Sequence, residues 1–229
     1  MIPIRDNIRS RRFPVMNVTL IVINVAIFLY EISLSQGQLS EFISAYGVTP
    51  REISALLAGQ SAMLPALLTL ITAMFLHGGW LHLLGNMLYL WIFGDNVEDR
   101  LGKAKYLLLY LATGIAGSLA QVWANPVAAE PVIGASGAIA GVLGAYFLSY
   151  PRAKVLTLVP IIFFITFIEI PAFIFLFLWF ILQWLSGFAT LGAAGNMVAW
   201  WAHIGGFAAG ALGVMLLAPA RKRSYLHGE

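Results

Sequence analysis

Long apolar runs without charged side chains are the feature that most limits how this chain can fold. Residues 64–94 and 170–220 contain no Asp, Glu, Lys or Arg. Over all 229 residues, 60% are hydrophobic and only 10% are charged, whereas soluble domains carry about a quarter charged residues. Because so little polar surface cannot cover a water-soluble globule, the sequence predicts an integral membrane protein.

The apolar runs predict an all-α, polytopic bundle of six transmembrane helices, since a span needs ~20 residues. Glycine, proline and charged residues mark the breaks between the expected spans, which cover residues 15–34, 80–93, 106–123, 136–150, 171–188 and 196–218. Pro171 suits the first turn of a helix. Between the spans, we expect a moderately polar stretch at 35–61, a segment dipping into the interface at 64–76, and a segment at the cytoplasmic interface at 155–168.

The distribution of basic residues supports this count. Of the 13 Lys and Arg residues, Arg51 alone falls on one side of a six-span arrangement, and the other twelve fall on the opposite side. Basic residues favour the cytoplasmic side. We therefore expect a basic cytoplasmic N-terminus (1–14), a six-span domain (15–218) and a basic cytoplasmic tail (219–229) in the plasma membrane. The first span lacks a small-residue cleavage site, so we interpret it as an anchor.

Ser136 is a candidate nucleophile within the motif Gly134-Ala135-Ser136-Gly137. It is expected to open a short helix, where backbone N–H groups without helical partners could bind an oxyanion. The motif alone fits equally well a site of close packing with a capping serine, and that alternative stays open at this point.

His203 is a candidate general base at a depth that matches Ser136. Counting 1.5 Å per residue from the inner ends of spans four and six, both residues lie about 21 Å along their helices. In a hydrocarbon core of ~30 Å, both would lie about 9 Å below the outer boundary. Small-residue stripes would let these two helices approach closely; they consist of Gly137, Gly141 and Gly144 on one helix and Gly206, Gly210 and Gly213 on the other.

His82 and Asn86 are four residues apart, so they share one helix face and could donate hydrogen bonds to a tetrahedral intermediate. A zinc site using His82 with His77 or His203 is weakly supported, because no acidic ligand accompanies them. Interhelical hydrogen bonding alone is the other alternative. Since Glu169 is interpreted as a helix-end anchor, we expect a Ser-His dyad without a carboxylate, and no metal or cofactor. The chain has no cysteine, which excludes thiolate catalysis.

Four motifs together resemble the rhomboid family of intramembrane serine proteases, in its simple six-span prokaryotic form. They are HGGWLHLLGN (77–86), EDRLG (98–102), GASGAIAG (134–141) and AHIGGFAAG (202–210). The resemblance implies that Ser136 is the nucleophile and His203 the base. It also implies an oxyanion hole formed by Asn86, His82 and the Ser136 N–H, shaped by Gly134.

By the same resemblance, the fifth span would be a lateral gate, and the substrates would be single-span membrane proteins cut near the outer end of their helix. Lipid is expected as the surrounding partner, and nucleic acid is not. Some rhomboids carry a tyrosine four residues after the serine that packs on the histidine, whereas this chain has Ala140 there. Two rival functions remain, a non-catalytic rhomboid-like protein that escorts membrane clients and a small transporter or channel.

Overall fold

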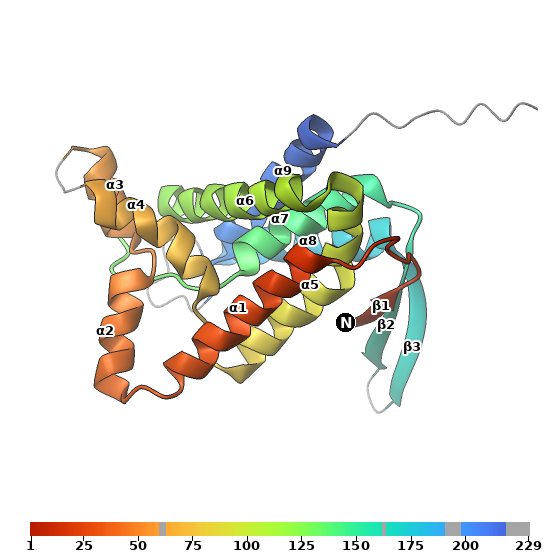
Figure 1. Cartoon of the computed structure of the whole chain (residues 1–229), viewed down its shortest axis with the longest axis horizontal. Helices are drawn as coiled ribbons and strands as arrows, with labels where there is room; N and C mark the ends of the chain where they lie inside the picture. Colours follow the sequence, from red (N-terminus) through yellow and green to blue (C-terminus); the bar gives the residue numbers. More distant parts are fainter. Residues whose placement is uncertain (60–62, 162–163, 191–197, 219–229) are drawn as a thin grey trace, which may run out of the picture.

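Six helices form a bundle in the computed structural model, which describes residues 1–59, 63–161, 164–190 and 198–218 (Figure 1). Each predicted span corresponds to one helix, although α5 continues well beyond the predicted end at residue 93; the helices are α1 (Val15–Glu31), α5 (Trp80–Leu101), α6 (Lys103–Ala124), α7 (Ser136–Ser149), α8 (Ala172–Ala189) and α9 (Trp200–Leu217). Residues 196–197, predicted to begin the sixth span, and the predicted tail at 219–229 lie outside the described residues.

By length and apolar composition, fewer than six of these helices qualify as membrane spans. Three of the described helices, α6, α8 and α9, are long and apolar enough to cross a membrane. A fourth crossing results if Pro65–Phe75 and α5, which meet at a bend of 82°, are counted as one broken span. Helices α1 and α7 are apolar but shorter. The chain is therefore a multi-pass membrane protein, and the count of six remains a prediction.

The segment between α1 and α5 folds into short helices at the end of the bundle remote from the N-terminus (Figure 1). These are α2 (Gln36–Tyr46), α3 (Pro50–Leu57), α4 (Met63–Thr72) and the 3-10 helix η1 (Ala73–Phe75). Ser35 and Gln38 form a capping box that fixes the start of α2. The sharp bend between α4–η1 and α5 agrees with the prediction that residues 64–76 do not continue the following span.

A three-stranded antiparallel sheet was not predicted and corrects the expectation of a purely helical fold. Its strands are β1 (Ile2–Asp6), β2 (Lys154–Ile161) and β3 (Phe164–Pro171), paired in the order β1-β2-β3. The stretch 155–168 is thus a hairpin that pairs with the N-terminus. At the base of this hairpin, Glu169 of β3 pairs with Lys154 of β2 at 3.1 Å, and both side chains are more than half exposed. Glu169 therefore lies on a strand and not at a helix end, and its surface ion pair contributes little to stability.

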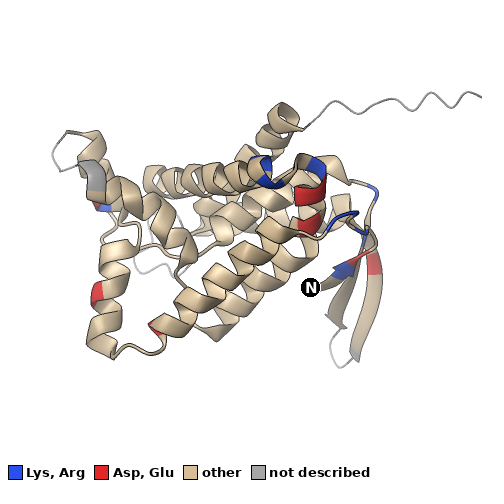
Figure 2. Ribbon diagram, in the orientation of Figure 1, with Lys and Arg blue, Asp and Glu red and all other residues tan. Residues whose placement is uncertain are grey.

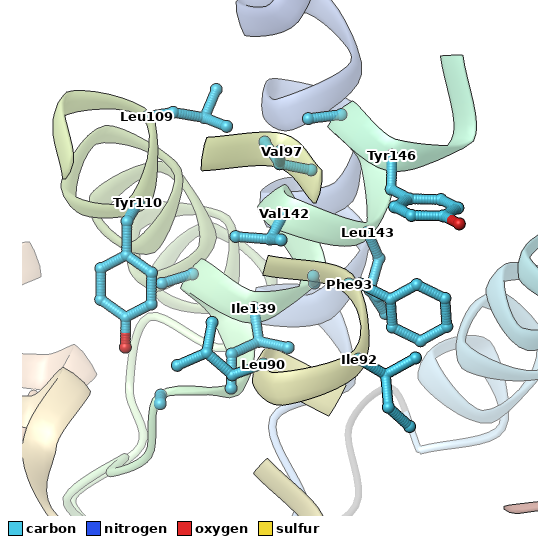
Figure 3. Packing of buried hydrophobic residues seen from close by; sticks show 14 of the residues in the cluster. Leu90, Ile92, Phe93, Val97, Leu109, Tyr110, Ile139, Val142, Leu143 and Tyr146 are labelled. Carbon is cyan, nitrogen blue, oxygen red and sulfur yellow. The ribbon is translucent and has the colours of Figure 1, made fainter. Parts of the chain in front are cut away.

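The core lies where α5, α6 and α7 meet. Figure 3 shows Leu90, Phe93 and Val97 of α5 packing against Ile139, Val142 and Leu143 of α7, with Leu109 and Tyr110 of α6 beside them. All of these side chains are fully or almost fully buried. By contrast, many large apolar side chains of α8 are exposed, as expected of a helix facing lipid.

The motif EDRLG has a structural explanation. The Glu98 carboxylate accepts hydrogen bonds from the backbone N–H groups of Met16 (3.1 Å) and Asn17 (2.7 Å), so it caps the start of α1. Gly102 has φ +79° and makes the tight turn that joins α5 to α6, a backbone conformation that L side chains rarely adopt. The motif thus ties three helices together at one end of the bundle.

Asp6 fastens the sheet to the bundle. Its Oδ2 accepts hydrogen bonds from Asn96 Nδ2 (3.0 Å) on α5 and from the Tyr146 hydroxyl on α7. Burial, assisted by the nearby charge of Asp95, raises the pKa of Asp6 from 3.8 to about 6 and outweighs the opposing effect of the Tyr146 hydrogen bond. The carboxylate form is therefore disfavoured in this position.

The raised pKa predicts a pH-dependent effect of Asp6→Asn. The folded state binds the Asp6 proton more tightly than the unfolded state, so wild-type stability from this group falls as pH rises from about 4 to about 6. Asparagine keeps the accepting oxygen without the charge. Allowing for solvent screening, we expect the variant to gain about 1–2 kcal/mol in free energy of unfolding at pH 7, and almost nothing at pH 4. Unfolding in detergent at both pH values measures this, and a pH-independent difference would contradict it.

Candidate active site

Ser136 is the first residue of α7, as predicted. Ala135 precedes the helix without a side-chain cap, and the first helical hydrogen bond runs from Ile139 N to the Ala135 carbonyl. The N–H groups of the first turn, including that of Ser136, therefore lack acceptors within the helix. Gly134 N–H donates to the Ala73 carbonyl at 2.8 Å, which holds the approach to the helix against η1.

Gly134 is required at this place for two independent reasons. Its φ is +125°, which L side chains rarely adopt. In addition, a Cβ added there would lie 2.7 Å from His82 Nε2 and 3.8 Å from Asn86 Nδ2. The structure thus brings together the predicted residues His82, Asn86 and Gly134 directly beside Ser136.

His82 is oriented to donate. The Gly78 N–H donates to His82 Nδ1 at 3.3 Å, so Nδ1 is the acceptor and the ring proton lies on Nε2. Because Nε2 is the atom that lies against Gly134, its N–H is directed at the segment leading to Ser136. His82 can therefore stabilise negative charge that develops there.

Asn86 also has a donor to spare, and it is held by His77, which the sequence considered alone suggested only as a zinc ligand. Asn86 Nδ2 lies 3.0 Å from His77 Nε2, and since an amide NH₂ only donates, one of its two hydrogens remains available. The backbone N–H of His77 is in turn bound by both carboxylate oxygens of Glu31, at 3.2 and 3.3 Å. Glu31 is 1% exposed, and its only sequence signal is a lone acid at the end of an apolar run. It acts on the site through His77 and not by contact with Ser136.

These hydrogen bonds also bear on the zinc alternative. The His77 and His82 rings lie close, with centroids 5.1 Å apart. However, Nε2 of His77 and Nδ1 of His82 already accept hydrogen bonds from Asn86 and Gly78. The pair is therefore arranged as part of a hydrogen-bond network.

His203 lies one turn into α9, with Nδ1 2.7 Å from Oε1 of Gln183 on α8. Its ring is flanked by Trp179 and Trp200, at centroid distances of 6.0 and 6.1 Å. Like Ser136 and His82, His203 is only partly buried.

The contact between α7 and α9 brings the segments of Ser136 and His203 together. A Cβ on Gly206 would lie 2.0 Å from the Gly137 carbonyl oxygen, and one on Gly210 would lie 1.8 Å from that of Gly141. At the same end, Gly137 faces Ala202 at ordinary contact distances. Ser136 and His203 are thus the sequence neighbours of two residues that face each other.

The predicted small-residue stripes meet at most positions, although a Cβ on Gly141 would itself point at Thr113 of α6. Gly144 also meets α9, where a Cβ would lie 2.1 Å from the Phe207 carbonyl oxygen. Gly213, however, faces Leu109 of α6 and not α7. Ala140 lies in the contact against Gly206, so it supplies no ring to pack on His203.

Comparison with known proteins agrees with the fold and the motifs. A family model described as Rhomboid domain matches residues 64–220. The rhomboid protease GluP of Bacillus subtilis is 49% identical over 76 residues, which are 33% of this chain and 14% of that protein. The mitochondrial rhomboid protein 1 of Saccharomyces cerevisiae is 40% identical over 96 residues, which are 40% of this chain and 28% of that protein. The putative rhomboid protease YdcA of B. subtilis is 43% identical over 77 residues, which are 34% of this chain and 38% of that protein.

The aligned regions thus span well under half of each of these relatives. The family match, by contrast, covers more than half of this chain and includes all of α5 to α9. This chain belongs to the rhomboid family.

Proposed function

We propose that this protein is an intramembrane serine endopeptidase that cleaves transmembrane segments of other membrane proteins with a Ser136–His203 dyad. The observation that supports this proposal most is that the candidate catalytic residues lie around the start of one helix, α7. Ser136 opens α7 beside two oriented side-chain donors, and the contact of α7 with α9 presents His203 at the same end. The names of two B. subtilis relatives include rhomboid protease, in agreement with this proposal.

In the proposed reaction, Ser136 Oγ attacks the carbonyl carbon of the scissile peptide while His203 Nε2 removes the hydroxyl proton. The carbonyl oxygen becomes an oxyanion that accepts hydrogen bonds from Asn86 Nδ2, His82 Nε2 and the Ser136 N–H. His203 then gives its proton to the departing amine, which leaves an ester on Ser136. Water attacks this ester by the same route in reverse, restoring the hydroxyl and releasing the carboxylate product.

The proposal also includes the membrane topology. The chain would cross the plasma membrane six times, and the end of the bundle that carries the sheet would face the cytoplasm. Figure 2 shows Lys and Arg gathered around the sheet and the adjoining ends of the bundle helices. The 14 residues of α7 span about 21 Å, less than the ~30 Å of the hydrocarbon core. If its inner end is at the cytoplasmic boundary, Ser136 lies below the outer surface, where water must reach it for hydrolysis.

A serine-directed fluorophosphonate probe tests the proposal against its rivals. In detergent or liposomes, the wild type should be labelled and should cleave a single-span model substrate, while Ser136→Ala should remain unlabelled. An escort protein would bind the substrate without labelling or cleavage. A transporter would show solute flux in liposomes that Ser136→Ala leaves unchanged.

Asn86→Ala should reduce turnover by less than loss of the nucleophile. Removing one of several oxyanion donors costs ten- to a thousandfold in kcat, because the remaining donors still act. The effect should fall on kcat with little change in KM, since the oxyanion exists only after attack. Cleavage kinetics measure the split, and a pure KM effect would show that Asn86 binds substrate instead.

A further inference from the structure

Gln183 makes a short hydrogen-bond contact with His203. Its Oε1 lies 2.7 Å from His203 Nδ1, across the interface between α8 and α9. Gln183 is 8% exposed although it sits on a helix with many exposed apolar side chains. A buried polar group without a partner would be costly at membrane depth, so this amide is held in place by the bond it makes.

The chemistry of the two atoms fixes the proton of the imidazole. An amide oxygen only accepts, so His203 Nδ1 must be the donor. In a neutral imidazole the other nitrogen then carries the lone pair. Nε2 of His203 is therefore left as the basic atom, which is the state a general base needs before it can remove a proton from Ser136.

Neither Ala140, the two flanking tryptophans nor Glu169 can replace Gln183 as the acceptor for His203 Nδ1. Ala140, on the facing helix, packs against Gly206 and has no polar atom. Trp179 and Trp200 flank the ring, but a tryptophan N–H can only donate and cannot accept from Nδ1. The acid Glu169 is on the hairpin, paired with Lys154.

We propose that Gln183 is a positioning residue that fixes the tautomer and the ring orientation of His203 for catalysis. This inference rests on the proposed function for its kinetic consequence, whereas the tautomer itself does not depend on any activity. The competing explanation is that Gln183 only joins α8 to α9, in which case its loss would affect stability and leave the proton on the same nitrogen.

Nitrogen-15 NMR of histidine-labelled protein in detergent reads the tautomer directly. The His203 signals are identified by their loss in His203→Ala. We expect wild-type His203 to carry its proton on Nδ1, and Gln183→Leu to populate the Nε2–H form. Gln183→Glu, which keeps an accepting oxygen, should retain Nδ1–H. A wild-type ring protonated on Nε2, or an unchanged tautomer in Gln183→Leu, would overturn the proposal.

Kinetics supply the second measurement. Gln183→Leu should lower kcat about tenfold, corresponding to one lost hydrogen bond, with KM nearly unchanged. Gln183→Glu should restore most of that turnover and move the acid limb of the pH–rate profile to higher pH, because a carboxylate favours the protonated imidazole. Gln121→Leu on α6 is the matched control and should alter neither turnover nor tautomer.

The outcomes separate this inference from the proposed function. If the wild type neither cleaves substrate nor binds the fluorophosphonate, the protease proposal fails, and the NMR result still decides the role of Gln183. If the wild type is active while Gln183→Leu is equally active with the same pH profile, only the positioning role is wrong. Should Gln183→Leu fail to fold, Gln183→Glu alone decides, since loss of the Nδ1–H form or a pH profile equal to that of the wild type would contradict the proposal.

Discussion

Replacing Ser136 with alanine is expected to lower turnover of a membrane-spanning substrate by about 10⁵-fold or more, with no loss of fold. In the proposed reaction, Ser136 Oγ alone forms the acyl bond, and in serine proteases loss of the nucleophile removes nearly all the catalysis of the whole unit. The side chain is small and begins a helix, so alanine leaves the α7–α9 contact unchanged. Cleavage of a single-span substrate in liposomes measures the effect.

His203→Ala should have nearly the same effect, because nucleophile and base act as a unit and their losses do not add. The double variant should therefore be no worse than either single one. Ser118→Ala on α6 is a matched control and should keep full activity. Undiminished turnover in either dyad variant, with thermal unfolding as in the wild type, would show that the two residues are structural.

Replacing Gly210 with valine should cost about 10³-fold in turnover and about 3 kcal/mol or more in free energy of unfolding. A Cβ on Gly210 would lie 1.8 Å from the Gly141 carbonyl oxygen, so α7 and α9 must separate by more than 1 Å to admit it. Overpacking typically costs 1–3 kcal/mol, and backbone atoms yield less than side chains. A misplacement of 1 Å can already cost about 10² in rate, and the proposed base and nucleophile lie on the two separated helices.

Gly85→Ala on α5 provides the control for this test, because nothing lies within 4 Å of the position a Cβ would take. It should be neutral or slightly stabilising, since alanine favours the helix over glycine. Unfolding by denaturing detergent and substrate cleavage are measured on both variants. If Gly210→Val kept its activity, close contact of the two helices would not be what assembles the site.

The helices and the candidate site could be predicted because their signals are local. Gly134-Ala135-Ser136 is a helix start whichever way the bundle packs, and Ser136 does open α7. His203 was placed at the same end by counting residues along two helices, and the facing pair Gly137 and Ala202 agrees with that count. The small-residue stripes could be predicted from the sequence spacing of their glycines alone.

What the sequence could not predict depends on contacts between distant segments. Strand β2 lacks the alternation of a half-buried strand, and its partner β1 lies about 150 residues earlier. Gln183 meets His203 only through the packing of α8 on α9. Glu31 was missed because its role runs through the backbone of His77, and a bond to a backbone N–H leaves no trace in residue type.

The pairing of β1 with β2 has a consequence for biosynthesis. Ile2 is among the first residues to leave the ribosome, and its partner Leu158 is made more than 150 residues later. At 5–20 residues per second, that interval is roughly ten to thirty seconds. During it, the nascent N-terminus has no strand to join, and the earlier helices can already have entered the membrane. Closure of the sheet is therefore a late event, which can occur only after α7 has been synthesised.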